Sequence, residues 1–264
     1  MNIPQPILQV SELTMAYGDI VIQSGLTFTV NRGDIFVVMG GSGCGKSTLL
    51  RHMVGLKAPF KGTVSYEGVS LWEASETDRA GLLRKMGVLY QGGALWSSMT
   101  IAENISVPLE AYTPLNRREI SEMVSLKLAL VGLTGFEEYY PSEISGGMRK
   151  RAGLARAIAL DPEILFIDEP SSGLDPVNAS LMDDLIMELR DSLGSTVVMV
   201  THELASIFAV GNNSVFLDAD RKTMIAHGDP DELLRGCSDP AVQAFLRRQG
   251  KYVHEKSGIE PLER

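Results

Sequence analysis

The sequence predicts an α/β fold in which helices surround a mostly parallel sheet. Short apolar runs at residues 35–39, 163–167 and 196–200 have the length and composition of buried strands. Segments with apolar residues at helical spacing lie between them. Alternation of such strands and helices is typical of a parallel sheet with helices on its faces.

The individual elements follow from periodicity and from turn signals. Expected strands cover residues 7–15, 26–30, 35–39, 63–66, 88–90, 163–167, 196–200 and 214–217. Expected helices cover residues 48–54, 78–85, 177–193, 231–235 and 239–248, and another helix follows Ser145. Residues 100–133 change character, because Ile101, Ile105 and Leu109 recur at helical spacing, and we interpret them as a helical insertion.

Composition limits the class of protein. The chain has 264 residues, of which 44% are hydrophobic and 22% charged, as expected for a globular protein with a substantial core. The net charge of −9 argues against a nucleic-acid partner, which requires a basic face. The two cysteines, Cys44 and Cys237, are expected as free thiols in a reducing compartment. No secretory signal or run of about 20 apolar residues is evident, so we expect a cytoplasmic protein whose membrane role requires partner chains.

Residues 40–48 fit the phosphate-binding pattern G-x-x-x-x-G-K-[ST], between an expected strand and an expected helix. They are Gly40, Gly41, Ser42, Gly43, Cys44, Gly45, Lys46, Ser47 and Thr48. The glycines let backbone N–H groups approach phosphate oxygens, and the helix N-terminus adds its positive dipole end. Lys46 supplies a charge for the β- and γ-phosphates, and Ser47 offers a hydroxyl to Mg²⁺. A glycine-rich turn without function is the alternative, which the complete motif in this context disfavours.

A second candidate site follows the apolar run at residues 164–167. Asp168 comes at the end of that run, where an aspartate can hold Mg²⁺ directly or through water. Glu169 comes next and is placed to accept a proton from a water that attacks the γ-phosphate. An acidic helix cap is the alternative for this pair taken alone, but an upstream phosphate loop favours the catalytic interpretation.

A third candidate site is Ser145-Gly146-Gly147. Ser145 can cap the helix that follows, and the two glycines leave backbone N–H groups open to an anion. The chain therefore has two phosphate-binding helix ends, although one nucleotide needs only one. A dimer resolves this surplus, because the second helix end can serve the nucleotide of a partner.

With these three sites, the chain resembles the nucleotide-binding subunits of ATP-binding cassette (ABC) transporters. Ser145-Gly146-Gly147 is similar to the family signature Leu-Ser-Gly-Gly-Gln, with Ile144 and Met148 in place of Leu and Gln. The resemblance extends over nearly the whole chain. It implies a P-loop NTPase of the ABC type, with an antiparallel β subdomain at the N-terminus and a helical insertion subdomain.

The resemblance also gives roles to four residues outside those motifs. Asp175 resembles the D-loop aspartate that reaches across the dimer, and His202 resembles the switch histidine near the γ-phosphate. Gln91 resembles the Q-loop glutamine, which touches the metal site and faces the membrane subunit. Tyr17 occupies the place of the aromatic residue that stacks on adenine. Three of them have a bland alternative when taken alone: His202 could be a capped or core histidine, Gln91 a solvated turn residue and Tyr17 a strand end.

What the family implies for the mechanism is a head-to-tail homodimer with ATP and Mg²⁺ as cofactors. Each nucleotide would lie between one phosphate loop and the partner's Ser145, Gly146, Gly147 and Asp175. Ser47, Gln91 and Asp168 would hold the metal, and Lys46, Gln91, Glu169 and His202 would be the catalytic residues. We expect the domain to cover residues 1–249, with the helical subdomain at about 100–160, and a polar tail to cover residues 250–264.

A finer resemblance is to the MlaF-like ATPases of Mla/MCE lipid transporters. It rests on three stretches: Gln91–Trp96, Glu103–Leu109 and Ser145–Arg151 with its Met148. It implies phospholipid transport, integral-membrane permease subunits, a small regulatory subunit and an MCE protein as partners, and a place on the cytoplasmic face of the bacterial inner membrane. The ATPase of an amino-acid or other small-solute importer is the alternative, since it would share every catalytic motif.

Overall fold

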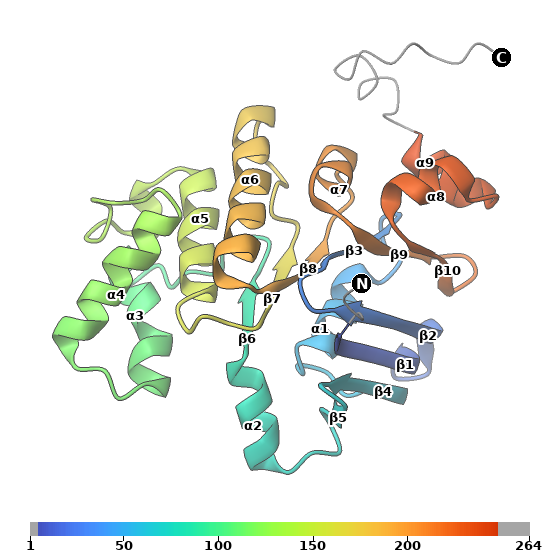
Figure 1. Cartoon of the computed structure of the whole chain (residues 1–264), viewed down its shortest axis with the longest axis horizontal. Coiled ribbons are helices and arrows are strands. Elements are labelled where there is room, and N and C mark those ends of the chain that lie inside the picture. The colour runs from blue at the N-terminus through green and yellow to red at the C-terminus, as the bar shows by residue number, and fades with distance from the viewer. Residues whose placement is uncertain (1–4, 248–264) are drawn as a thin grey trace.

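Two β-sheets lie on either side of α1 in the computed structural model, which describes residues 5–247 (Figure 1). The smaller sheet is antiparallel and has the strand order β2-β1-β4-β5: Ile20–Asn31, Pro6–Tyr17, Lys61–Tyr66 and Val69–Ser70. The larger has the order β10-β9-β3-β8-β7-β6: Thr223–Gly228, Asn213–Asp218, Ile35–Gly40, Thr196–Val200, Ile164–Asp168 and Met86–Leu89. All of its strands are parallel except β10, so the predicted fold class is confirmed.

Helices cover the larger sheet and fill the connections between its parallel strands. They are α1 (Lys46–Met53), α2 (Glu76–Arg84), α3 (Ile101–Tyr112), α4 (Arg117–Leu130), α5 (Gly146–Ala157), α6 (Pro176–Leu193), α7 (Leu204–Val210), α8 (Pro230–Gly236) and α9 (Pro240–Leu246), with a 3₁₀ turn at Pro141–Glu143. Between β6 and β7, α3, α4 and α5 pack on one another. Capping boxes fix the first two of these, at Thr100 with Glu103 and at Asn116 with Glu119.

Strand β3 shows how one sheet separates two hydrophobic cores. Successive side chains of a strand point to opposite faces, and every residue of β3 is buried. Ile35, Val37 and Met39 join the core beneath α3–α7, while Phe36 and Val38 join the core beneath the antiparallel sheet and α1. A strand buried on both faces reads as a continuous apolar run, which is why this element could be predicted from the sequence.

The differences from the predicted elements have physical causes. Strand β2 spans 12 residues, whereas only residues 26–30 were expected to be extended, because irregular register against β1 obscures the alternation of its side chains. Helix α7 and strand β10 were not expected: α7 is short and mostly apolar, and β10 is an edge strand with half-buried residues. The tail at residues 250–264 and the end of the expected helix 239–248 lie outside the described residues.

Behind the strand ends, a buried hydrogen-bond chain links α6 with α7. The Ser206 hydroxyl donates to Asp183 Oδ2 over 2.8 Å, and Ser171 Oγ lies 3.4 Å from Ser206 Oγ. Asp183 is 6% exposed, and its Oδ1 is buried with no hydrogen-bond partner among the described residues. Burial raises the pKa of Asp183 to about 6, although the bond from Ser206 opposes this.

We expect Asp183→Asn to stabilise the protein at pH 8. The carboxyl pKa is higher in the folded than in the unfolded chain, so the folded state binds the extra proton between those two values and loses stability as pH rises through them. An amide stays neutral and can still accept from Ser206, so the gain should be about 1–3 kcal/mol at pH 8. Urea unfolding at pH 8 and near pH 4 measures it; an equal difference at both pH values would contradict the explanation.

Candidate active site

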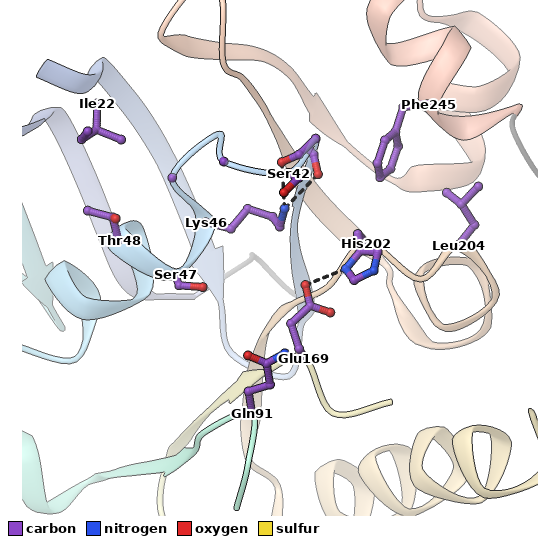
Figure 2. A pocket seen from close by; sticks show the side chains of 14 residues that line it. Ile22, Ser42, Lys46, Ser47, Thr48, Gln91, Glu169, His202, Leu204 and Phe245 are labelled. Carbon is purple, nitrogen blue, oxygen red and sulfur yellow. Dashed lines mark hydrogen bonds and ion pairs between the residues drawn. The ribbon is translucent and has the colours of Figure 1, made fainter. Parts of the chain in front are cut away.

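The carboxyl ends of four neighbouring parallel strands meet at one edge of the larger sheet. The phosphate loop follows β3, Asp168 ends β7 and Glu169 comes directly after it, His202 follows β8 and Gln91 follows β6. In open α/β sheets this edge is where ligands bind. A cavity of about 640 Å³ opens there (Figure 2), lined by Ile22, Gly40, Gly41, Ser42, Gly43, Gly45, Lys46, Ser47, Thr48, Gln91, Glu169, His202, Leu204 and Phe245.

The shape of the phosphate loop depends on two of its glycines. Gly40 has φ +146°, and a Cβ there would lie 2.4 Å from the Leu217 carbonyl oxygen. Gly45 has φ +98°, and a Cβ there would lie 2.8 Å from Ile22 Cγ2. No side chain caps α1, which begins directly after Gly45, so its first N–H groups remain available for an anion.

Two side chains donate hydrogen bonds to carbonyl groups of the loop. The Lys46 ammonium donates to the carbonyl oxygens of Gly40 and Gly41 over 2.9 and 3.0 Å, which places a positive charge at the cavity. Behind the loop, the fully buried Gln23 donates through Nε2 to the Cys44 carbonyl over 2.7 Å. Because a trans peptide points its C=O and N–H in opposite directions, this bond turns the N–H of Gly45 away from Gln23.

Glu169 and His202 form a contact pair at the cavity. Glu169 Oε1 lies 2.8 Å from His202 Nδ1, as Figure 2 shows. Glu169 lines the cavity, and its Oε2 is buried with no hydrogen-bond partner among the described residues, so the residue has an unsatisfied acceptor. Glu169 also has φ +51°, a left-handed conformation that is costly for a residue with a side chain and is found disproportionately at functional sites.

Two oxygen ligands near Glu169 suit a magnesium ion. Ser47 Oγ lies 3.4 Å from Asp168 Oδ1, so a hydroxyl and a carboxylate face the same point. Burial, and then the neighbouring Glu169, raises the pKa of Asp168, because both destabilise the charged carboxylate. A bound cation would offset that destabilisation. Within residues 5–247 no group of three His, Cys, Asp or Glu could hold a metal by itself, so phosphate oxygens and water would complete the coordination.

Several predicted site residues lie outside the cavity. Tyr17 is 44% exposed and its hydroxyl accepts a hydrogen bond from Arg51, while the Lys57 ammonium lies 3.1 Å from the centre of its ring. Cys44 is buried beneath the loop, and burial raises the pKa of its thiol. Asp175 is exposed and caps α6 by accepting from the N–H groups of Val177 and Asn178.

The signature segment is also remote from this chain's own cavity. Ser145 caps α5, as predicted, by accepting from the Met148 N–H over 3.2 Å. None of Ser145, Gly146 and Gly147 lines the cavity, and Gly147 lies beside Leu174 and Asn178. Figure 1 shows α5 and α1 well separated, with α6 between them in this view. One chain therefore presents two separate helix N-termini for an anion.

Three apolar cavity residues were not predicted. Ile22 comes from β2, Leu204 begins α7, and Phe245 comes from α9, where its ring packs edge-on against Phe216. Leu204 lies two positions after His202, so its proximity to the site could have been predicted from the sequence. Phe245 has no local sequence signal, because only tertiary packing brings α9 to the cavity.

The comparisons with known proteins agree with this geometry. The family model described as ABC transporter matches residues 23–172, more than half of the chain. The chain belongs to the ABC transporter family. It is an ATPase cassette of that family, in keeping with its phosphate loop and acidic strand end.

Two named relatives and one solved structure illustrate the similarity of this ABC ATPase to known proteins. The "probable ribonucleotide transport ATP-binding protein mkl" of Mycobacterium tuberculosis is 41% identical over 90% of this chain, which covers only 66% of that protein. The "intermembrane phospholipid transport system ATP-binding protein MlaF" of Escherichia coli K12 is 37% identical over 91% of this chain and 88% of its own. The ATP-binding cassette MJ0796, solved as a dimer with ADP and Pi, has a TM-score of 0.77 at 25% identity, covering 84% of this chain and 98% of its own.

We expect Lys46→Ala to weaken ATP hydrolysis strongly. The substitution removes the ammonium that lies at the cavity, and loss of such a preorganised donor costs about 2–4 kcal/mol of transition-state stabilisation. Steady-state kinetics should show the corresponding fall in kcat/KM, whereas Lys61→Ala, on the exposed start of β4, should leave it unchanged. An unaltered kcat/KM in Lys46→Ala would contradict the role of this lysine.

Proposed function

We propose that this ABC ATPase is the motor subunit of a lipid transporter of the Mla/MCE type and works as a homodimer on membrane permease subunits. The observation that carries the motor function is the separation of two anion-binding helix ends, one at the cavity and one at Ser145. Neither can act on the other's nucleotide within one chain, so a head-to-tail dimer completes both sites. The dimeric MJ0796 cassette and the similarity to MlaF support this assembly and this cargo.

Residues that line the cavity, together with Asp168 and Tyr17 outside its lining and residues of a partner subunit, divide the work of hydrolysis. The loop N–H groups and Lys46 would bind the phosphates, and Ser47, Asp168 and Gln91 would hold Mg²⁺, which would supply positive charge to neutralise the phosphates. Glu169 Oε2 accepts the proton of the attacking water, and His202 holds the carboxylate through Oε1. Tyr17 provides an aromatic ring for adenine, and the partner's Ser145, Gly146, Gly147 and Asp175 close over the triphosphate.

We expect Glu169→Gln to bind ATP and accumulate as a closed dimer. The amide keeps the size of the side chain but cannot take a proton, so kcat should fall by at least about 100-fold. Size-exclusion chromatography with ATP should then detect the dimer, while wild type returns to monomer as it hydrolyses the nucleotide. Full ATPase activity in Glu169→Gln would reject Glu169 as the general base.

A groove on the same domain supports the permease as partner. It has a volume of about 440 Å³, lies among α2, β6, α3 and α5, and carries the exposed rings of Trp96 and Tyr112. Arg156 lies over Trp96 and Arg84 over Tyr112, so both rings are held in place while they remain exposed. Its lining residues Trp96, Val107 and Pro108 follow Gln91, the residue expected from the family resemblance to face the membrane subunit. Within residues 5–247, no helix is long and apolar enough to cross a membrane.

We expect Trp96→Ala to reduce permease binding by about tenfold, because exposed aromatic anchors dominate such interfaces. Co-purification of the permease with the tagged chain from detergent-solubilised membranes measures this. Tyr139→Ala, which removes another exposed ring outside the groove, is the matched control. Equal recovery of permease with both variants would reject the groove as the docking surface.

The transported molecule is tested on the native complex. Mass spectrometry of the purified assembly should identify the permease and bound phospholipid, and phospholipid should stimulate its ATPase activity. The small-solute importer is the competing function, and mkl is named for ribonucleotide transport. A permease without bound lipid, stimulated only by a polar solute, would overturn lipid transport while leaving the ATPase motor intact.

A further inference from the structure

A buried lysine of α5 contacts the main chain that carries Glu169. Lys150 is 7% exposed, and its Nζ donates to the carbonyl oxygens of Glu169 over 3.2 Å, of Pro170 over 2.9 Å, and of Ser172. An ammonium has three N–H donors, so this set of acceptors satisfies it completely. Desolvation lowers the pKa of Lys150, which shows that burial of this charge has a cost.

The contact fixes a backbone conformation that would otherwise relax. Glu169 has φ +51°, and for a residue with a Cβ this conformation costs about 1 kcal/mol or more unless its surroundings hold it. Its N–H donates to the Val200 carbonyl over 2.8 Å, and its C=O accepts from Lys150. Both polar groups of the peptide backbone at Glu169 are thus held, one by β8 and one by α5.

The orientation of the Glu169 carboxylate depends on this backbone. In the left-handed conformation of Glu169, Oε1 reaches His202 and Oε2 is buried with no partner among the described residues. Without Lys150, the carbonyl groups of Glu169, Pro170 and Ser172 would each lose a hydrogen-bond donor. The φ angle of Glu169 would then be less restrained. A shift of the side chain by about 1 Å is enough to reduce the rate of a positioned reaction substantially.

Helix α5 makes a second contact of the same kind. Arg156 donates to the carbonyl oxygens of Gly93 and Ala94 over 3.1 and 2.8 Å, and a Cβ on Gly153 would lie 2.8 Å from Gly93 Cα. The helix that begins at Ser145 therefore holds the segment after Gln91 and the segment after Glu169. Lys150 is the contact that reaches the proposed general base itself.

We propose that Lys150 is a positioning residue for ATP hydrolysis: it holds the Glu169 backbone through three carbonyl groups and ties it to the helix that begins at Ser145, a role that rests on the proposed function of Glu169. In the dimer the N-terminus of α5 would face the partner's nucleotide, so Lys150 would join that contact to the chain's own hydrolytic residue.

The test separates positioning from folding by comparing two buried lysines of the same helical region. Lys150→Met removes the donors, Lys150→Gln keeps an amide that can still reach part of the carbonyl set, and Lys127→Met removes a lysine that is 1% exposed and paired with Asp161 far from the cavity. Each full-length variant is measured for kcat and KM with Mg·ATP, for equilibrium binding of a fluorescent ATP analogue, and for Tm.

We expect Lys150→Met to lower kcat by about tenfold or more while the dissociation constant for nucleotide changes by less than about threefold, since phosphate binding is untouched. Lys150→Gln should retain an intermediate kcat. Lys127→Met should lower Tm but keep kcat within about twofold of wild type. If Lys150→Met does not fold, the kcat of Lys150→Gln against Lys127→Met gives the same comparison.

Three results would overturn the positioning role: an unchanged kcat in Lys150→Met, an equal loss of kcat in Lys127→Met, or a loss of nucleotide binding that accounts for the whole loss of activity. A wild-type chain without ATPase activity would instead reject the proposed function. Wild-type activity that does not depend on Lys150 would reject only this inference.

Discussion

The attraction between a triphosphate and a set of fixed N–H and ammonium donors is the interaction on which this structure depends. Such donors must be held close together where water does not screen their attraction for the phosphates. In this protein they lie at one edge of a parallel sheet. Gly40 and Gly45 permit the close backbone approach, and α1 offers its uncapped N-terminus. The remainder of the larger sheet delivers Asp168, Glu169 and His202 to the same edge.

The same arrangement is the physical basis of the proposed dimer. The donors of α5 begin at Ser145, and they lie apart from the cavity of their own chain. Within one chain, the N-terminus of α5 therefore does not contribute to the lining of the cavity. Since α5 also contacts the backbone of Glu169 and the segment that follows Gln91, its N-terminus is connected through one helix to both of these proposed catalytic residues.

Local patterns allowed much of the fold and the centre of the site to be predicted. A buried parallel strand is a continuous apolar run, so β3, β7 and β8 were recognisable, and a candidate site residue lies at or just after the end of each. Irregular pairing hid most of β2, and short length hid α7. Phe245 and Lys150 were not identified as parts of the site, because their importance arises only from contacts between segments distant in sequence. The roles of Tyr17 and Asp175 rest on the family resemblance and stay predictions.

Phe245 has a consequence for the way this protein is made. The cavity takes its phosphate loop from the first part of the chain and one of its apolar walls from α9, the last described helix. During synthesis the loop leaves the ribosome long before that wall, so a nascent chain exposes its glycine-rich loop on an open surface. The cavity is therefore complete only after Phe245 has left the ribosome and α9 has packed against the rest of the chain.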